Sequence, residues 1–186
     1  MTEVKRQKVK GKNKATHLAA FFFCLFTFAF LLLSAQPAAA QDDLAPPPVK
    51  VVSREEVARL NAEAEDIKER TKLVLELMNV RLASAEKLRA GEDFDGVFRE
   101  LGYFHGLMDN GLDFLQKRNN GSGKILDNFK RLEIGLRMFV PRLEMVRREV
   151  PLRYEDYIRK LIRFVRDART KATEPLFSDK VVRTPK

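Results

Sequence analysis

The stretches KILDNFKRLEIGLRMFVPRLEMVRRE, residues 124–149, and PLRYEDYIRKLIRFVRDARTKAT, residues 151–173, decide the fold. In the first stretch, apolar side chains recur every three or four residues, at Ile125, Phe129, Leu132, Leu136, Phe139, Leu143 and Val146. The second stretch repeats this spacing, at Tyr154, Ile158, Leu161, Val165, Ala168 and Ala172. Each set lies on one face of an α-helix, and Pro151 fits the first turn of the second helix. Because the connection is so short, the two helices are expected to pack antiparallel.

A longer helix is expected earlier in the chain. Ser53 and Glu56 have the spacing of a capping box, which marks a helix start. Apolar residues then continue in helical register as far as Leu88, and Gly91 suits the C-terminal cap. We therefore predict one helix of roughly 36 residues, about 50 Å long at 1.5 Å per residue. Because more amphipathic helices follow, packing within the chain is favoured over a coiled-coil dimer.

The next helix, predicted from an N-cap at Asp93 to about Lys117, is rich in glycine. Each glycine in a helix interior costs about 1 kcal/mol relative to alanine, so an offsetting interaction is expected. Two interpretations are open: close approach of a neighbouring helix over Gly102 and Gly106, or a turn at residues 109–111. The apolar stripe continues in phase beyond the turn signal, which favours a continuous helix. A small-ligand groove, if present, is expected beside Gly102, His105 and Gly106.

These helices predict an all-α domain over residues 53–173. The linkers at 90–93, 118–124 and 149–152 are short, which favours a mostly antiparallel four-helix bundle with up-down-up-down connectivity. The preceding segment, residues 41–52, contains three consecutive prolines and is interpreted as an extended spacer. Residues 174–186 have little periodicity and are interpreted as a C-terminal tail.

The N-terminal segment indicates export. Residues 18–35, LAAFFFCLFTFAFLLLSA, carry no charge, and six basic side chains precede them against one acid. Ala38-Ala39-Ala40 supplies a small-residue cleavage site, so residues 1–40 read as a secretory signal peptide. The apolar run also reaches the length of a membrane span, and the alternative is an uncleaved anchor with residues 18–35 as its core. Both interpretations place the domain outside the cytoplasm, either periplasmic, secreted or membrane-anchored.

The composition argues against catalysis and metal binding. Cys24 is the only cysteine and lies in the export segment, and His105 is the only histidine after residue 40. A Cys/His zinc site is excluded on ligand count, and no metal or other cofactor is expected. The acidic clusters lie where helices begin, where capping explains them. We therefore expect no enzymatic activity.

Charge is divided unevenly along the chain. The whole sequence has a formal net charge of +9, but removing residues 1–40 leaves 29 basic and 25 acidic side chains, or +4. Residues 41–116 carry −6 and residues 117–186 carry +10. Candidate residues for binding an anionic surface lie on the last helix: Arg159, Lys160, Arg163, Arg166 and Arg169. The alternative is that this basic face is solvated or pairs with the acidic first helix.

These observations favour an exported, non-catalytic helical protein that acts as an interaction or structural module of the cell envelope. A protein partner or self-association is expected. The alternative is peripheral binding of anionic lipid head groups or polysaccharide through the basic helix, and a third hypothesis is a small ligand beside Gly102 and Gly106. Nucleic acid is not expected, because the domain lies outside the cytoplasm and lacks an aromatic stacking platform. Membrane contact is expected only through the N-terminal segment.

Overall fold

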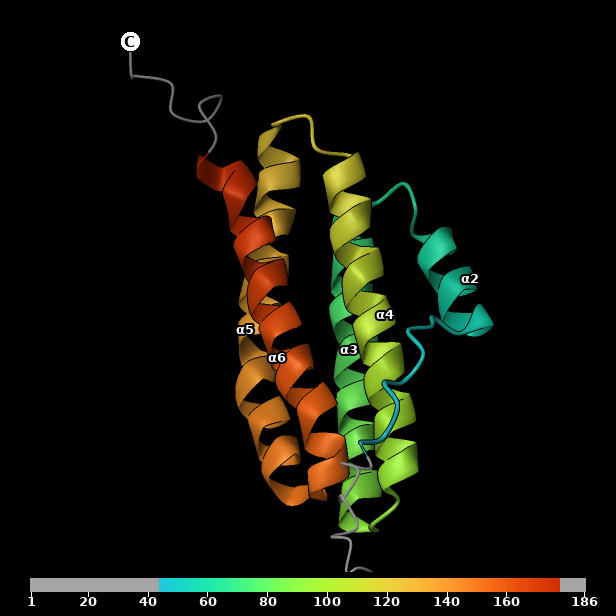
Figure 1. The fold of residues 1–186 in the computed structure, drawn as a ribbon. Helices are drawn as coiled ribbons and strands as arrows, with labels where there is room; N and C mark the ends of the chain where they lie inside the picture. Colours follow the sequence, from blue (N-terminus) through green and yellow to red (C-terminus); the bar gives the residue numbers. More distant parts are fainter. Residues whose placement is uncertain (1–43, 178–186) are drawn as a thin grey trace, which may run out of the picture. The chain divides into compact units, whose positions relative to one another are not determined.

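The computed structural model describes residues 44–177, and this part of the chain is all-α (Figure 1). It contains five α-helices with antiparallel packing, and a short 3-10 helix follows them. The elements are α2 (Arg54–Ala62), α3 (Ile67–Ala90), α4 (Phe94–Lys117), α5 (Gly123–Glu149), α6 (Leu152–Thr173) and η1 (Glu174–Phe177). The predicted export segment, residues 1–40, lies outside the described residues. Between residues 44 and 177, no helix is both long and apolar enough to cross a membrane.

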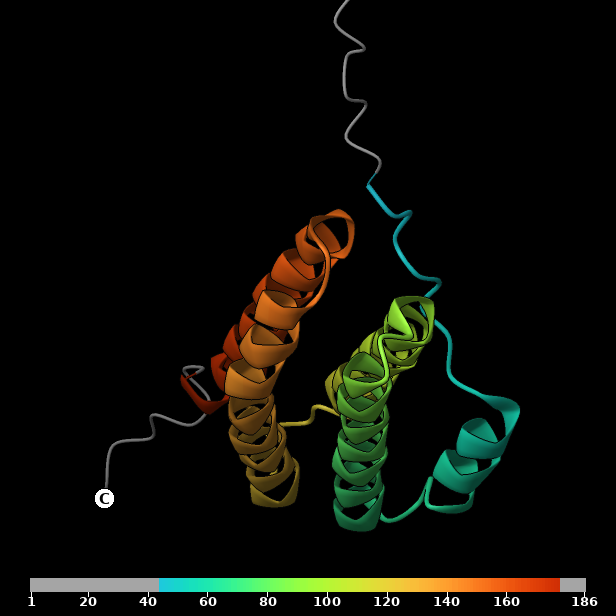
Figure 2. The ribbon, with the colours of Figure 1, turned by 90° about the horizontal axis from the view of Figure 1, so that it is seen from below.

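The four long helices, α3 to α6, form a helical bundle in which each helix runs opposite to the one before it (Figure 1). α3 packs on α4 and α5 packs on α6, and the two pairs meet through α3 with α5 and α4 with α6. Figure 2 shows these pairs side by side. Large, fully buried side chains fill the core between the two helix pairs, among them Met78, Phe104, Phe129 and Leu132.

Several predicted helix ends are confirmed. Ser53 and Glu56 form a capping box at the start of α2, and the Asp93 side chain accepts a hydrogen bond from Gly96 N at the start of α4. α4 is continuous from Phe94 to Lys117, as the unbroken apolar stripe predicted. Pro151 takes the N-cap position of α6, one residue before the predicted first turn.

The prediction of one helix over residues 53–90 is wrong. The first helix ends at Ala62 and the next begins at Ile67, so the described part holds five helices where four were expected. Asp66 caps the new start, because its carboxylate accepts hydrogen bonds from Lys68 N at 2.9 Å and Glu69 N at 3.2 Å. The apolar spacing stays in helical register across the break, which is why periodicity alone did not reveal it.

Two arginines hold the junction between α2 and α3. Arg70 is buried and donates a hydrogen bond to the Leu60 carbonyl, and Arg118 donates to the Ala64 carbonyl at 3.1 Å. Their guanidinium carbons lie 4.3 and 4.2 Å from the centre of the Phe114 ring. Carbonyl groups at the end of a helix need such donors, and the aromatic ring stabilises the cations by cation–π attraction.

α2 is attached to the bundle mainly by polar contacts. Leu60 is its only apolar side chain in the buried core, whereas the buried Glu56 accepts a hydrogen bond from Arg81 Nε at 2.8 Å. Arg81 also donates to Glu100 of α4 at 3.1 Å and so links three helices. Burial opposes ionisation of Glu56, but hydrogen bonds from Arg81 and Ser53 outweigh it and lower the pKa of this carboxyl.

Candidate functional site

Residues 44–52, here called the strap, are extended and lie against the bundle before α2 begins (Figure 1). Ala45 N donates a hydrogen bond to the Arg153 carbonyl at 3.0 Å, at the start of α6. Farther along, Lys50 Nζ lies 3.2 Å from Asp109 Oδ2 of α4. The segment interpreted from its sequence as a spacer is therefore bonded to two helices of the bundle.

The glycines of α4 make room for the strap. A Cβ atom on Gly102 would lie 2.5 Å from the Val49 carbonyl oxygen, and one on Gly106 would lie 2.6 Å from that of Val51. The expected close approach is present, but the neighbour is an extended segment instead of a helix. The space beside Gly102, His105 and Gly106, where a ligand groove was expected, is filled by the protein's own backbone.

His105 lies between these two glycines and is only 2% exposed. Its Nδ1 lies 3.3 Å from the Tyr157 hydroxyl, its Nε2 lies 3.8 Å from Asp109 Oδ2, and its ring centre is 5.0 Å from that of Phe164. Burial lowers the pKa of His105; the nearby Lys50 charge adds to this effect, and Asp109 opposes it. This environment is that of a packed, hydrogen-bonded histidine.

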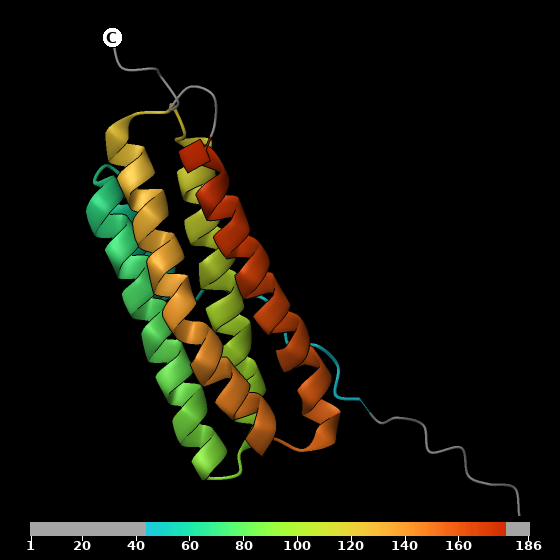
Figure 3. The same cartoon turned by 90° about the vertical axis from the view of Figure 1, so that its left-hand side faces the viewer.

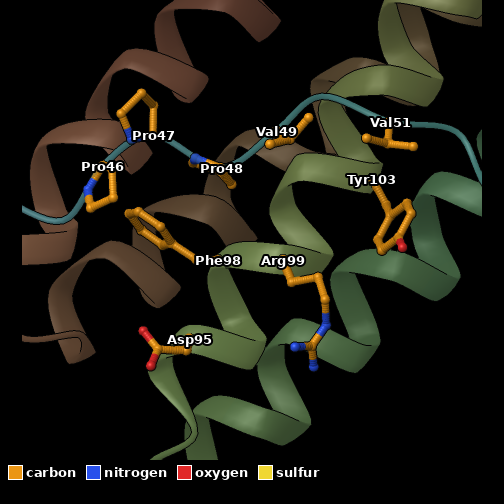
Figure 4. Close-up of a pocket in the computed structure, with 9 residues that line it drawn as sticks. All are labelled: Pro46, Pro47, Pro48, Val49, Val51, Asp95, Phe98, Arg99 and Tyr103. Atoms are coloured by element: carbon orange, nitrogen blue, oxygen red, sulfur yellow. The ribbon is translucent and has the colours of Figure 1, made fainter.

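A pocket of about 370 Å³ lies between the strap and α4 (Figure 4). The strap lines it with Pro46, Pro47, Pro48, Val49 and Val51, and α4 lines it with Asp95, Phe98, Arg99 and Tyr103. Asp95 already accepts a hydrogen bond from the Tyr154 hydroxyl at 2.6 Å. The pocket thus offers mostly apolar surface, with a cation and an engaged carboxylate at its edge. Among residues 44–177, no cluster of three or more His, Cys, Asp or Glu side chains could hold a metal ion.

Most of the candidate basic residues on α6 are paired with acids. The contacts are Arg159 with Glu155 at 2.7 Å, Lys160 with Asp156 at 2.7 Å, Arg166 with Glu144 at 3.5 Å and Arg169 with Glu133 at 2.8 Å. Arg163 is exposed and forms no ion pair within the described residues. The acids belong to α5 and α6 and not to the first helix, because α6 packs on α5 and α4.

Glu133 is the centre of the tightest of these clusters. Its side chain is only 9% exposed and accepts hydrogen bonds from Arg137 at 3.0 Å and from Arg169 at 2.8 Å. Burial opposes its ionisation, but the two guanidinium groups outweigh burial and lower the pKa of the carboxyl. Arg169 therefore joins α6 to α5, which reduces its availability for an external anion.

A surface that was not predicted from the sequence lies on the outer face of α5. Ile134, Met138 and Met145 are 48%, 67% and 58% exposed, and Pro141 between them is exposed as well. We call these four residues the α5 stripe. In Figure 3, α5 faces the viewer and runs between α3 and α6. A second apolar repeat, out of phase with the core positions, was the sequence signal that could have indicated it.

Comparison of the chain with protein-family models, with curated proteins and with solved structures finds no match.

Proposed function

We propose that the protein is an exported, non-catalytic interaction module of the cell envelope. In this proposal an export segment precedes an up-down-up-down four-helix bundle, to which α2 and the strap are added. The observation that carries the proposal is the α5 stripe. A stable bundle has no structural need for large apolar side chains on consecutive turns of its outer face.

The arrangement of the stripe is more informative than the exposure of any one residue. Isolated exposed apolar residues are normal on protein surfaces, and Val80 of α3 and Leu152 of α6 are examples. The α5 stripe instead aligns four apolar residues on one helix face. A row of exposed apolar side chains on one helix face is typical of protein–protein contact sites.

The proposal is tested by crosslinking and affinity purification of the C-terminally tagged protein from native cells. We expect a defined protein partner that survives a salt wash and is lost when Met138 and Met145 are both replaced by Glu. Val80→Glu is the matched control, because Val80 is also half-exposed but lies on α3. An unchanged set of partners in the Met138→Glu, Met145→Glu variant would count against the proposal. The intact mass of the bait also determines whether the chain begins at Gln41.

Binding of anionic lipid head groups or polysaccharide through α6 is the alternative. It has less support, because Arg159, Lys160, Arg166 and Arg169 already have acidic partners. Retention in the envelope that disappears at moderate salt and on neutralising Arg163 would favour this alternative. A small ligand beside Gly102 and Gly106 would require the strap to leave.

A further inference from the structure

We propose that the α5 stripe binds an acidic amphipathic helix of a partner protein. This inference rests on the proposed interaction function and adds the chemistry of the partner. It follows from the spacing of the stripe and from the charges around it.

The spacing fits a helical partner. Ile134, Met138, Pro141 and Met145 are separated by four, three and four residues, which is the alternation of d and a positions in a coiled-coil seam. A partner helix with the same apolar repeat could insert its side chains between them. The stripe covers about three turns of α5, roughly 17 Å at 1.5 Å per residue. This length suits one short helix better than a broad, flat interface.

The charges beside the stripe are mainly positive. Lys130, Arg137 and Arg148 are exposed, and Arg131 is half-buried. Lys130 and Arg148 form no ion pair within residues 44–177, whereas Arg137 shares the Glu133 carboxylate with Arg169. The exposed acids on this side are Asp127, at the N-terminal end of the stripe, and Glu149, four residues after Met145. Glu149 is already paired with Arg89 of α3 at 2.6 Å. Carboxylates flanking the apolar face of a partner helix would therefore find unpaired cations.

Neighbouring helices do not reverse this sign. On the α6 side, Glu133 and Glu144 of α5 are each contacted by two arginines, Glu133 by Arg137 and Arg169 and Glu144 by Arg147 and Arg166, so four cations face two acids. On the α3 side, Glu86 is engaged by Arg142 at 2.8 Å. An acidic helix thus meets a positive rim along most of the stripe.

Other occupants fit less well. In a symmetric contact between two copies, the same cations would face one another and repel. The parts of this chain outside the structure are also unsuitable: residues 1–40 carry six basic side chains and one acid, and residues 178–186 carry three and one. Residues 41–43 are too short to form an amphipathic helix.

The test uses the mature protein purified from cells and two synthetic helical peptides. Both peptides carry Leu at a and d positions; one has Glu and the other Lys at the flanking positions. By fluorescence anisotropy at low salt, we expect the Glu peptide to bind at least about tenfold more tightly than the Lys peptide. Met138→Glu should abolish this binding, and Lys130→Glu with Arg148→Glu should reverse the preference. Val80→Glu should leave it unchanged, and circular dichroism verifies that each variant is folded.

The alternative outcomes are distinct. Equal binding of both peptides, or no effect of the charge reversal, overturns the acidic-partner inference but leaves an apolar interaction site. Failure of both peptides to bind, while capture from cells still depends on Met138, also overturns this inference and not the proposed function. Dimerisation that Met138→Glu abolishes would identify a second copy as the occupant. If the stripe variants alter neither peptide binding nor capture from cells, the inference and the proposed function both fall.

Discussion

Gly102 and Gly106 are the single residues on which the position of the strap depends. Their hypothetical Cβ atoms would lie 2.5 and 2.6 Å from carbonyl oxygens of the strap, which are backbone atoms and cannot rotate away as a side chain could. We expect Gly102→Ala or Gly106→Ala to displace the strap and raise the rate of trypsin cleavage at Lys50 at least about tenfold, because local opening controls proteolysis. Mass spectrometry of the fragments measures that rate.

The matched control for these substitutions is Gly123→Ala. Gly123 also lies in a helix, but no atom comes within 4 Å of its hypothetical Cβ. In a helix interior, alanine is more favourable than glycine by about 1 kcal/mol. The free energy of unfolding of the Gly102→Ala and Gly106→Ala variants can therefore rise even though the strap detaches. Equal cleavage at Lys50 in all three variants would refute the claim that these glycines position the strap.

His105 should make stability depend on pH. Burial holds its pKa below the ordinary value of about 6.5, so the unfolded chain binds more protons as the pH falls below that value. Above pH 6.5 the neutral imidazole makes its full contribution to the free energy of unfolding. This contribution is lost as the pH falls towards the pKa of His105 in the folded state, with a slope of at most about 1.4 kcal/mol per pH unit. Urea unfolding between about pH 7.5 and 5.5 should show a shallower slope for His105→Gln than for the parent. Parallel curves would contradict this assignment.

For individual residues, the sequence indicated the kind of environment better than the residues that they contact in the fold. His105 borders the apolar stripe of its helix, a position typical of a packed, hydrogen-bonded histidine, and the structure places it in such an environment. The glycines of α4 indicated a close approach, but not what approaches, because a tertiary contact with an extended segment leaves no periodic signal. The basic residues of α6 could likewise not be paired with acids before the neighbours of α6 were known.

Among the elements, α2 is the one held mainly by charge. Arg81→Met would leave the buried Glu56 carboxylate without its cation. Breaking a buried ion pair in this way lowers stability by about 3 kcal/mol. Because only Leu60 adds apolar burial, we expect α2 to detach locally while α3 to α6 stay folded. Hydrogen exchange should show faster amide exchange in residues 54–62. Arg59→Met is the control, since Arg59 and Glu76 form an exposed pair at 3.8 Å; equal exchange in both variants would contradict this account.

The boundaries of the elements were predictable where apolar periodicity and capping agreed. The Asp93 cap and the stripe after it placed α4 correctly, and the hairpin of α5 and α6 follows from residues 124–173. The break before α3 was missed because capping and periodicity disagreed there. Asp66 followed by Glu69 has the pattern of a helix start, but the apolar register across it masked that signal.

At the scale of the whole molecule, the sequence predicted the all-α class and the antiparallel packing, since short linkers between amphipathic helices leave few alternatives. The candidate site was less predictable. The strap depends on contacts between distant residues, such as Ala45 with Arg153 and Lys50 with Asp109. The α5 stripe is apparent only once the core face of α5 is fixed, because both faces of that helix carry apolar residues.

The bundle of α3 to α6 should fold without the segment before it. Among residues 44–66, Leu60 is the only fully buried apolar side chain, so a chain starting at Ile67 loses about 3 kcal/mol of core burial from this segment and keeps the core of α3 to α6. We expect such a chain to unfold cooperatively in urea. It should also lose the pH dependence assigned to His105, because water reaches the imidazole once the strap is absent.

Leu60→Ala in the full chain separates the effect of losing the Leu60 side chain from the effect of losing the strap. This variant loses a similar burial energy but retains the strap, so its stability should fall by about 3 kcal/mol with the pH slope unchanged. The difference in pH slope between the truncated chain and Leu60→Ala measures the effect of the strap on His105. The strap is close enough for this effect, because its carbonyl groups contact α4 at Gly102 and Gly106, on either side of His105. A truncated chain that melts without cooperativity would make the strap and α2 part of the folding unit. A truncated chain that keeps the full pH slope would mean that the bundle alone buries His105.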